Sequence, residues 1–419
     1  MGLWTIGGGN RLYGDVWVQG SKNAALPILA ASLLHKGVTV LDAVPQITDV
    51  EEMLDILRLL GCSVKREGER VTIDAAEASG EAIPFATMSR VRGSVLFLGA
   101  LTARFGAGAV PIPRVSRLGP RPLDLHIDAL ARLGASVHFT DEAVCCRGSA
   151  MTGGDVVLAY PSVGATENAM LAACGCSGIT VLRNCAKEPE IAELGVYLRE
   201  IGMHVSGEGT DTVVISKGRT VGTVRHTLWS DSDAAATLLC AGAACGGELI
   251  LHQVISSHLQ PILDVLEEMG CNIKIQENSV KLISDGRLWA SGHEIVTGPY
   301  PGFPTNMQPL LMAACLRADG VTVFRERVFA GRLRHAKQLR RFGADITLTD
   351  DCAAMVVGVP ELQAAAVQAQ DLRGGAALLI AALQAEGVST VVDAGHIKRG
   401  YAHLDGTLRR LGADLEYTD

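Results

Sequence analysis

Two patterns of apolar and polar positions recur along the chain, and the first of them pairs a helix with a strand. Apolar residues spaced three and four apart lead to a glycine, and alternating apolar and polar residues follow. The spacing predicts a helix with one buried face, the glycine permits a left-handed helix end, and the alternation predicts a strand. The pattern occurs six times, at intervals of 68 to 73 residues, around Gly61, Gly134, Gly202, Gly270, Gly343 and Gly412.

The second pattern joins the end of a helix rich in small residues to a short apolar strand through a glycine. Its six copies are LLHKGVTVLDAV, FGAGAVPIPRV, CGCSGITVLRNC, CGGELILHQV, RADGVTVFRERV and QAEGVSTVVDAG. Both patterns share a period that exceeds the roughly 20–50 residues of stacked solenoid repeats. We therefore expect each repeat to be a compact subdomain with at least two helices and several strands, in an α/β (α+β) fold.

The length of the chain indicates two domains. At 419 residues it is too long for one ordinary hydrophobic core, so three repeats in each of two domains is the economical arrangement. We predict that residues 22–229 form the first domain and that residues 1–21 join residues 230–419 in the second. The junction is expected near Val224–Asp233. The active site is expected in the cleft between the domains, a favoured place for a ligand.

Charge and cysteine content exclude several classes of protein. A net charge of −8 argues against a protein that binds nucleic acid over a wide surface, although one small basic pocket remains possible. The eleven cysteines are odd in number and include no C-x-x-C pair, which favours buried thiols over disulfides or zinc. We find no signal peptide and no apolar run of the ~18–20 residues that span a bilayer. A cytoplasmic protein without metal or membrane contact is expected.

The first candidate for chemistry is the segment GSKNAALPILAASLL, which places Lys22 and Asn23 at the start of a predicted helix. The helix dipole and the free N–H groups of a first turn attract an anion there. An ordinary capped helix start is the alternative explanation.

A second candidate is the loop SRLGPRPLDLHIDAL, in which two prolines bracket Arg121. Asp124 and His126 follow before the next predicted helix. A stiff loop that presents a guanidinium, a carboxylate and an imidazole is typical of substrate positioning. A structural cap remains the alternative for His126.

Further candidates stand near equivalent places in several repeats. They are four arginines, each of which alone is expected to be a solvated surface residue. If the repeats face one cleft, however, these arginines and Lys22 would together bind one small polyanion. These arginines are Arg92, Arg332, Arg373 and Arg399. The segment YPSVGATEN adds a turn with free N–H groups, and FPTNMQ ends a proline-stiffened loop at Asn306. No phosphate-loop or dinucleotide fingerprint is present, so no cofactor is expected and no reaction follows from these residues alone.

Seven motifs, taken in order along the chain, resemble those of the UDP-N-acetylglucosamine carboxyvinyltransferases of the enolpyruvyl transferase family. They are GSKNAALPILAASLL, GPRPLDLHI, PSVGATEN, EPEI, FPTNMQ, DLR and HIKRGY. The resemblance runs over essentially the whole chain. It implies two inside-out α/β domains, each with threefold pseudo-symmetry. It also implies transfer of the enolpyruvyl group of phosphoenolpyruvate to the 3-hydroxyl of UDP-N-acetylglucosamine, with release of phosphate. That reaction opens peptidoglycan synthesis, and with it cell wall biogenesis, cell shape and cell division.

The resemblance also implies a role for individual residues. Binding of phosphoenolpyruvate is implied for Lys22, Asn23, Arg121, Arg332, Arg373 and Arg399. Binding of UDP-N-acetylglucosamine is implied for Asn23, Arg92, Arg121, Pro122, Leu123, Asp124, His126, Ser162, Val163, Gly164, Asn306 and Val328. Catalytic roles fall on Lys22, Ser116, Asn306 and Asp231. The expected partners are these two small molecules, with no nucleic acid, membrane or metal.

The chain departs from the family's pattern at three places, which comprise four residues. Ser116 stands where the family has a cysteine or an aspartate as proton donor, and a hydroxyl is a poor general acid. Asn306 replaces the aspartate that is the family's base, and an amide cannot take up a proton at neutral pH. Ser230 and Asp231 replace an Asp-Arg pair.

These departures leave three interpretations open. In the first, the chain is a working enzyme whose proton transfers pass to Lys22, Asp231 or a water. In the second, it is a paralogue that transfers enolpyruvate to another nucleotide or sugar. In the third, it is a non-catalytic pseudo-enzyme that keeps the ligand site. The retained set of cations favours the first two, because such charges repel one another in an empty pocket.

Overall fold

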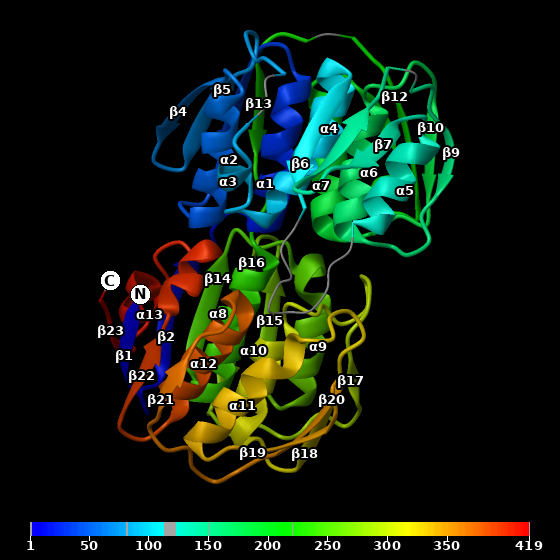
Figure 1. The fold of residues 1–419 in the computed structure, drawn as a ribbon. Helices are drawn as coiled ribbons and strands as arrows, with labels where there is room; N and C mark the ends of the chain where they lie inside the picture. The colour runs from blue at the N-terminus through cyan, green and yellow to red at the C-terminus, as the bar shows by residue number, and fades with distance from the viewer. Residues whose placement is uncertain (1, 81–82, 113–122, 150, 220, 419) are drawn as a thin grey trace. The chain divides into compact units, whose positions relative to one another are not determined.

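A computed structural model describes residues 2–80, 83–112, 123–149, 151–219 and 221–418. These residues form two compact units (Figure 1). The 20–229 unit holds the described residues from Gly20 to Trp229, and the 230–418 unit holds those from Ser230 onward together with the residues up to Gln19. Gly20 and Ser21 belong with the former because the Ser21 N–H donates to the Trp229 carbonyl at 2.7 Å.

Both units are built from small sheets that share one pattern of strand pairing. Five sheets have a parallel pair followed by two antiparallel pairings, in the orders β13-β3-β5-β4, β9-β10-β12-β11, β2-β14-β16-β15, β17-β18-β20-β19 and β21-β22-β1-β23. Within the described residues the remaining sheet, β6-β8-β7, has the two antiparallel pairings. The repeated connectivity confirms the repeats and the α/β class expected from the sequence.

The strands of the two units have the following bounds. In the 20–229 unit they are β3 (Val38–Asp42), β4 (Ser63–Glu67), β5 (Arg70–Asp74), β6 (Ala107–Pro111), β7 (Ser136–Phe139), β8 (Ala143–Arg147), β9 (Gly154–Val157), β10 (Thr180–Arg183), β11 (His204–Ser206), β12 (Thr212–Ser216) and β13 (Val224–Thr227). In the 230–418 unit they are β1 (Leu3–Gly7), β2 (Leu12–Trp17), β14 (Gly247–His252), β15 (Asn272–Gln276), β16 (Ser279–Ser284), β17 (Ile295–Val296), β18 (Val321–Arg325), β19 (Asp345–Asp350), β20 (Ala353–Val357), β21 (Ala366–Gln368), β22 (Val388–Val392) and β23 (Asp414–Thr418).

The N-terminal strands complete sheets made by the far end of the chain. β1 lies between β22 and β23, and Trp4 is paired with Val391 on one side and Tyr417 on the other. β2 runs parallel to β14. The first residues of the chain therefore supply strands to two subdomains of the 230–418 unit.

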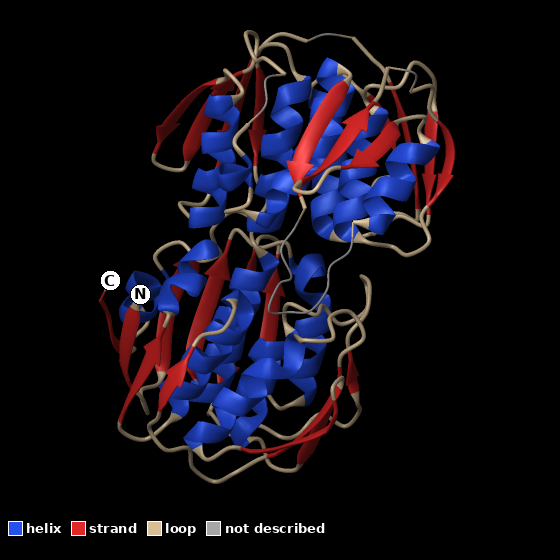
Figure 2. Cartoon of the chain, viewed as in Figure 1, coloured by secondary structure: helices blue, strands red, loops and turns tan. Residues whose placement is uncertain are grey.

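Each unit has an interior of helices with sheets outside them (Figure 2). The interior helices are buried on nearly all sides because they consist almost entirely of Ala, Gly and aliphatic residues. They are α1 (Lys22–Ala31), α4 (Phe97–Phe105) and α6 (Val163–Ala173) in the 20–229 unit, and α8 (Ser232–Cys245), α10 (Gln308–Ala314) and α12 (Leu372–Gln384) in the 230–418 unit. In the latter unit the three pack against one another. This is the inside-out arrangement that the family resemblance implies.

Other helices accompany the interior ones in each unit. They are α2 (Thr48–Leu59), α3 (Phe85–Met88), α5 (Asp124–Arg132), α7 (Pro189–Glu200), α9 (Gln260–Glu268), α11 (Ala336–Leu339) and α13 (Leu404–Arg410). The 3₁₀ turns are η1 (Ser32–Leu34), η2 (Arg92–Leu96), η3 (Ser256–Leu259), η4 (Cys315–Arg317), η5 (Arg332–His335), η6 (Arg340–Phe342) and η7 (Ala394–Arg399). None of the described helices combines the length and the apolar character needed to cross a membrane.

The six glycines of the first sequence pattern all adopt the left-handed conformation expected of them. Their φ angles lie between 84° and 101°, at Gly61, Gly134, Gly202, Gly270, Gly343 and Gly412. Each follows a helix and precedes a strand. A side chain at these positions would strain the backbone, which explains why the repeats keep glycine there.

Candidate active site

Several of the predicted site residues lie at the N-terminal ends of the interior helices. In the 20–229 unit, Lys22 and Asn23 begin α1, Arg92 opens the turn that leads into α4, and Ser162–Gly164 begin α6. The other unit repeats this placement, with Asp231 at α8, Asn306 just before α10 and Arg373 at α12. The first turn of a helix has N–H groups without partners inside the helix and the positive end of its dipole. Such ends are suited to anionic ligands.

At the start of α1, Ser21 and Asp49 hold the backbone and Lys22 in place. Ser21 Oγ accepts a hydrogen bond from the Ala24 N–H at 3.2 Å, which caps the helix. Lys22 Nζ lies 3.3 Å from Asp49 Oδ2, and the lysine side chain is only 13% exposed. The cation is thereby fixed beside the helix N-terminus.

His126 is a neutral group whose orientation is fixed by Asn168. The Asn168 amide is held by the Gly99 N–H at 2.7 Å from its Oδ1, and its Nδ2 donates to the Val95 carbonyl at 3.0 Å. The same Nδ2 lies 3.1 Å from His126 Nδ1. Because Nδ2 can only donate, Nδ1 accepts and the ring proton is on Nε2. Burial, and then the charge of Arg92, lower the pKa of His126 to about 4.

The start of α6 approaches His126 closely. A Cβ atom at Gly164 would lie 3.2 Å from His126 Cε1, so glycine is the residue that leaves the ring its space. Ser162 caps the helix by accepting from the Ala165 N–H at 3.4 Å. The structure thus brings Arg92, His126 and Ser162–Gly164 together, with Leu123 and Asp124 one turn before His126 at the start of α5.

In the 230–418 unit, Asp233 joins three of the helix ends. Its Oδ2 accepts from Asn306 Nδ2 at 2.9 Å, and the same oxygen is paired with Arg373 Nη2. Asn306 Oδ1 in turn accepts from Arg332 Nη2 at 2.9 Å. Asp233, Arg332 and Arg373 are all buried.

Arg332 is held by a second carboxylate through a threonine. Its Nε donates to Thr305 Oγ1 at 3.1 Å, and that hydroxyl donates to Glu326 Oε2 at 3.0 Å. The other oxygen of Glu326 accepts from the Val328 N–H at 2.7 Å and from the Phe329 N–H at 2.9 Å. Glu326 thereby fixes the backbone at Val328, one of the predicted positions.

Arg373 has partners on both terminal nitrogens of its guanidinium. Nη1 donates to the Tyr401 hydroxyl at 2.9 Å, and that hydroxyl lies 2.7 Å from Thr237 Oγ1. Burial opposes the charge, but neighbouring Asp233 outweighs it and raises the pKa of Arg373, which stays a cation. Asp371 caps α12 by accepting from the Arg373 and Gly374 N–H groups.

Two other predicted residues of this unit lie at helix ends. Asp231 is buried and accepts from the Ala234 N–H at 2.9 Å, which makes it the cap of α8. Arg399 is the last residue of η7 and is half-buried. Ser116, Arg121 and Pro122 lie outside the described residues.

Sequence reasoning missed Asp233, Thr305, Glu326 and Tyr401. Asp233 had a signal, because SDSD at the start of a helix places two carboxylates within one turn. Thr305 adjoins Asn306 in the FPTN motif. Glu326 and Tyr401 carry no local signal, since their importance comes from contacts with distant segments.

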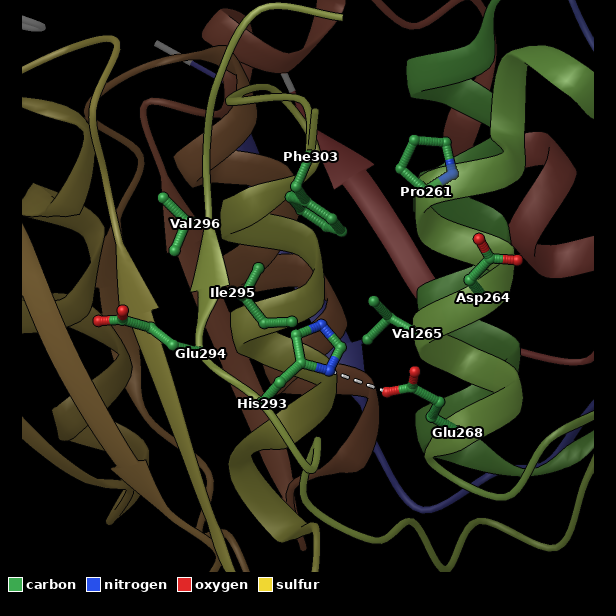
Figure 3. A pocket seen from close by; sticks show the side chains of 9 residues that line it. All are labelled: Pro261, Asp264, Val265, Glu268, His293, Glu294, Ile295, Val296 and Phe303. Atoms are coloured by element: carbon green, nitrogen blue, oxygen red, sulfur yellow. Dashed lines mark ion pairs between the residues drawn. The ribbon is translucent and has the colours of Figure 1, made fainter. Parts of the chain in front are cut away.

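A cavity of about 370 Å³ lies in the 230–418 unit between α9 and β17 (Figure 3). Val265, Ile295 and Phe303 line it beside acidic side chains, one of which, Glu268, pairs with His293 at 3.1 Å. The lining contains none of the predicted site residues and no arginine or lysine. This cavity does not suit an anionic substrate.

Two α/β units of repeated subdomains, with cations and amide groups at their interior helix ends, define the enolpyruvyl transferase class of protein. The family described as EPSP synthase (3-phosphoshikimate 1-carboxyvinyltransferase) matches residues 6–408, and the chain belongs to this enolpyruvyl transferase family.

Relatives with assigned activities are similar over their full length. The UDP-N-acetylglucosamine 1-carboxyvinyltransferase 2 of Caldanaerobacter subterraneus subsp. tengcongensis is 41% identical over 99% of both chains. The protein of the same name from Staphylococcus saprophyticus is 40% identical over 100% of both.

Solved structures agree with the fold. The enolpyruvyl transferase NikO from Streptomyces tendae has a TM-score of 0.88 and 26% identity, and the match covers 100% of this chain and 99% of that one. EPSP synthase from Acinetobacter baumannii has a TM-score of 0.74 at 19% identity over 100% of both chains, a likeness of fold alone.

Proposed function

We propose that the chain transfers the enolpyruvyl group of phosphoenolpyruvate to the 3-hydroxyl of UDP-N-acetylglucosamine and releases phosphate. The observation that carries this proposal is the full-length identity of about 40% to carboxyvinyltransferases of that name. In this role the chain acts in the cytoplasm and opens peptidoglycan synthesis, on which cell shape and cell division depend.

The reaction is an addition followed by an elimination. The sugar hydroxyl adds to C2 of phosphoenolpyruvate and loses its proton, while C3 gains a proton. The tetrahedral adduct then loses phosphate from C2 and a proton from C3, which restores the double bond. The protein must therefore hold a polyanion, accept a proton from the hydroxyl, and exchange a proton at C3.

We assign the binding of phosphoenolpyruvate to Lys22, Asn23, Arg121, Arg332, Arg373 and Arg399. Fixed cations stabilise the departing phosphate most when their partners already hold them in position, because no reorganisation is then needed during the reaction. Lys22 is held by Asp49, and Arg373 by Asp233 and Tyr401. These contacts support the assignment.

The nucleotide sugar is assigned to the group around His126. The start of α6 offers N–H groups to the diphosphate, and Arg92 adds a positive charge. His126 is neutral and donates through Nε2, so it serves as a hydrogen-bond donor rather than as a cation. Leu123, Asp124, Pro122, Asn306 and Val328 complete the proposed contacts.

The proton transfers are assigned among fewer groups than in other family members. Asn306 positions the sugar hydroxyl, since its amide cannot take up the proton. We assign the uptake of that proton to a water. Lys22, a cation beside Asp49, and Ser116 are assigned to the proton exchange at C3. Asp231 is engaged as the cap of α8, which favours a supporting role for it.

Two measurements test the proposed function. Calorimetric titration with UDP-N-acetylglucosamine is expected to show binding, and its absence would remove this acceptor. Phosphate release from phosphoenolpyruvate is then expected to require UDP-N-acetylglucosamine. Release with another uridine nucleotide in its place would indicate a paralogue, and binding without release would indicate a pseudo-enzyme.

A further inference from the structure

The carboxylate of Asp233 is buried where the ends of α8, α10 and α12 meet, and it contacts two residues of the proposed site. One of its oxygens accepts from Asn306 Nδ2 at 2.9 Å and pairs with Arg373 Nη2. Its residue is 4% exposed. Asp233 therefore acts on any ligand through these neighbours.

These contacts select one orientation of the Asn306 amide. A carboxylate can only accept hydrogen bonds, so Asp233 requires the NH₂ group on its side. A guanidinium can only donate, so Arg332 requires the carbonyl oxygen, which it meets at 2.9 Å. Both neighbours thus exclude the flipped amide. The Asn306 amide keeps a second lone pair on Oδ1 and a second N–H on Nδ2, which these two bonds do not use. A hydroxyl can donate to that lone pair and accept from that N–H.

The same carboxylate also sets the direction of Arg373. Asp233 takes Nη2 and the Tyr401 hydroxyl takes Nη1 at 2.9 Å, which fixes the plane of the guanidinium. Charge-assisted hydrogen bonds of this kind hold geometry more firmly than neutral ones.

We propose that Asp233 is a positioning residue, which fixes the Asn306 amide and the Arg373 guanidinium in the single arrangement that receives the sugar hydroxyl and phosphoenolpyruvate. The inference rests on the proposed function, because it takes Asn306 and Arg373 to touch the two substrates. It assigns this chain a carboxylate-amide pair, in which position 233 carries the charge and position 306 carries the amide.

An exchange of the two groups tests the pair. Asp233→Asn removes the charge that holds Arg373 and the acceptor-only group that faces the Asn306 amide, so only Arg332 still selects the amide's orientation. Asn306→Asp sets two carboxylates at the separation that a hydrogen bond now occupies, where like charges repel. The double variant Asp233→Asn/Asn306→Asp restores one carboxylate and one amide. Its carboxylate meets Arg332. The amide at position 233 turns so that its two contacts fall on different atoms, Nδ2 donating to the new carboxylate at position 306 and Oδ1 accepting from Arg373.

The rates of phosphate release are expected to follow this complementarity. Each single variant is expected to lose on the order of 100-fold in kcat/KM, the usual effect of misplacing a reacting group by about 1 Å. The double variant is expected to recover most of that loss, whereas independent effects would multiply to a loss on the order of 10,000-fold.

Asp371 provides the matched control. It begins α12 as Asp231 begins α8, and its side chain accepts hydrogen bonds from the Arg373 and Gly374 N–H groups rather than from Asn306. Asparagine also caps helices well, so Asp371→Asn keeps the fold. Combined with Asn306→Asp, it is expected to give no recovery. Thermal unfolding of every variant separates loss of fold from loss of rate.

Three outcomes overturn the inference. The first is an Asp233→Asn variant whose kcat/KM is unchanged. The second is a double variant whose loss in kcat/KM is simply the product of the two single losses. The third is an Asp371→Asn substitution that restores the rate of Asn306→Asp as much as Asp233→Asn does. If Asp233→Asn alone fails to fold, the exchanged double variant still decides, because it keeps both groups. A wild type without turnover would instead refute the proposed function, so the two failures are distinguishable.

Discussion

His226 is expected to make the stability of the protein depend on pH. The ring is buried between two carboxylates, with Nε2 3.2 Å from Glu193 and Nδ1 2.9 Å from Glu200. Burial alone would lower its pKa, but hydrogen bonds and the charges of Glu193 and Glu200 outweigh burial and raise it to about 9. His226 is therefore protonated in the folded protein at neutral pH.

The magnitude follows from linkage between protonation and folding. A rise from 6.5 to about 9 corresponds to about 3 kcal/mol of folding free energy. Because the folded pKa is the higher one, this contribution is complete below pH 6.5, the ordinary value, and is lost as the pH rises through about 9. His226→Gln removes the titrating group, so the variant is expected to be less stable than the wild type by about 3 kcal/mol at low pH. The difference should shrink towards zero at high pH.

Urea unfolding followed by circular dichroism, at pH values from about 6 to about 10, measures this difference. His252→Gln is the matched control, because His252 Nε2 pairs with Asp15 Oδ1 at 2.7 Å with both side chains partly exposed. That pair is expected to contribute less than ~1 kcal/mol at any pH. The reasoning is refuted if His226→Gln keeps the pH dependence of the wild type.

Three further predictions concern buried groups and the proposed site. Burial and two nearby glutamates raise the pKa of Glu167, so the folded protein loses stability as the pH rises through that raised value. Glu167→Gln should flatten this loss. In urea unfolding at neutral pH, the variant should have a free energy of unfolding higher by roughly 1–3 kcal/mol. Gly164→Ala should weaken UDP-N-acetylglucosamine binding about tenfold in calorimetry by crowding His126, while Gly222→Ala, which meets open space, should leave the affinity unchanged. Fosfomycin alkylates the loop cysteine of this family, whose place Ser116 takes in this chain. We expect no covalent fosfomycin adduct in the mass of the protein, because Ser116 is a poor nucleophile, and an adduct would contradict this.

Much of the fold could be predicted because its determinants are local. The left-handed glycines and the apolar interior helices are both written into short segments, and a period of about 70 residues showed that they belong to one repeated unit. Strand pairing could not be predicted in the same way. The partners of Trp4 are Val391 and Tyr417, and no local pattern joins segments so far apart.

The candidate site likewise contains residues whose place the sequence predicts and residues whose role it does not reveal. Residues that begin a helix, such as Lys22, Ser162 and Asp231, stand in motifs that mark a helix start, so the sequence predicts their place. Asp233 was missed because its role depends on Asn306, 73 positions away, and on Arg373, 140 positions away. Charge and spacing along the chain do not reveal such contacts.

If the proposed function is right, the chain transfers the enolpyruvyl group of phosphoenolpyruvate to UDP-N-acetylglucosamine. Mass spectrometry of the small molecules after incubation with both substrates, combined with a phosphate assay, tests it most directly. We expect one enolpyruvyl UDP-N-acetylglucosamine to form for each phosphate released, and none to form when either substrate is withheld. Phosphate released without a modified sugar, or both substrates recovered intact, would contradict it.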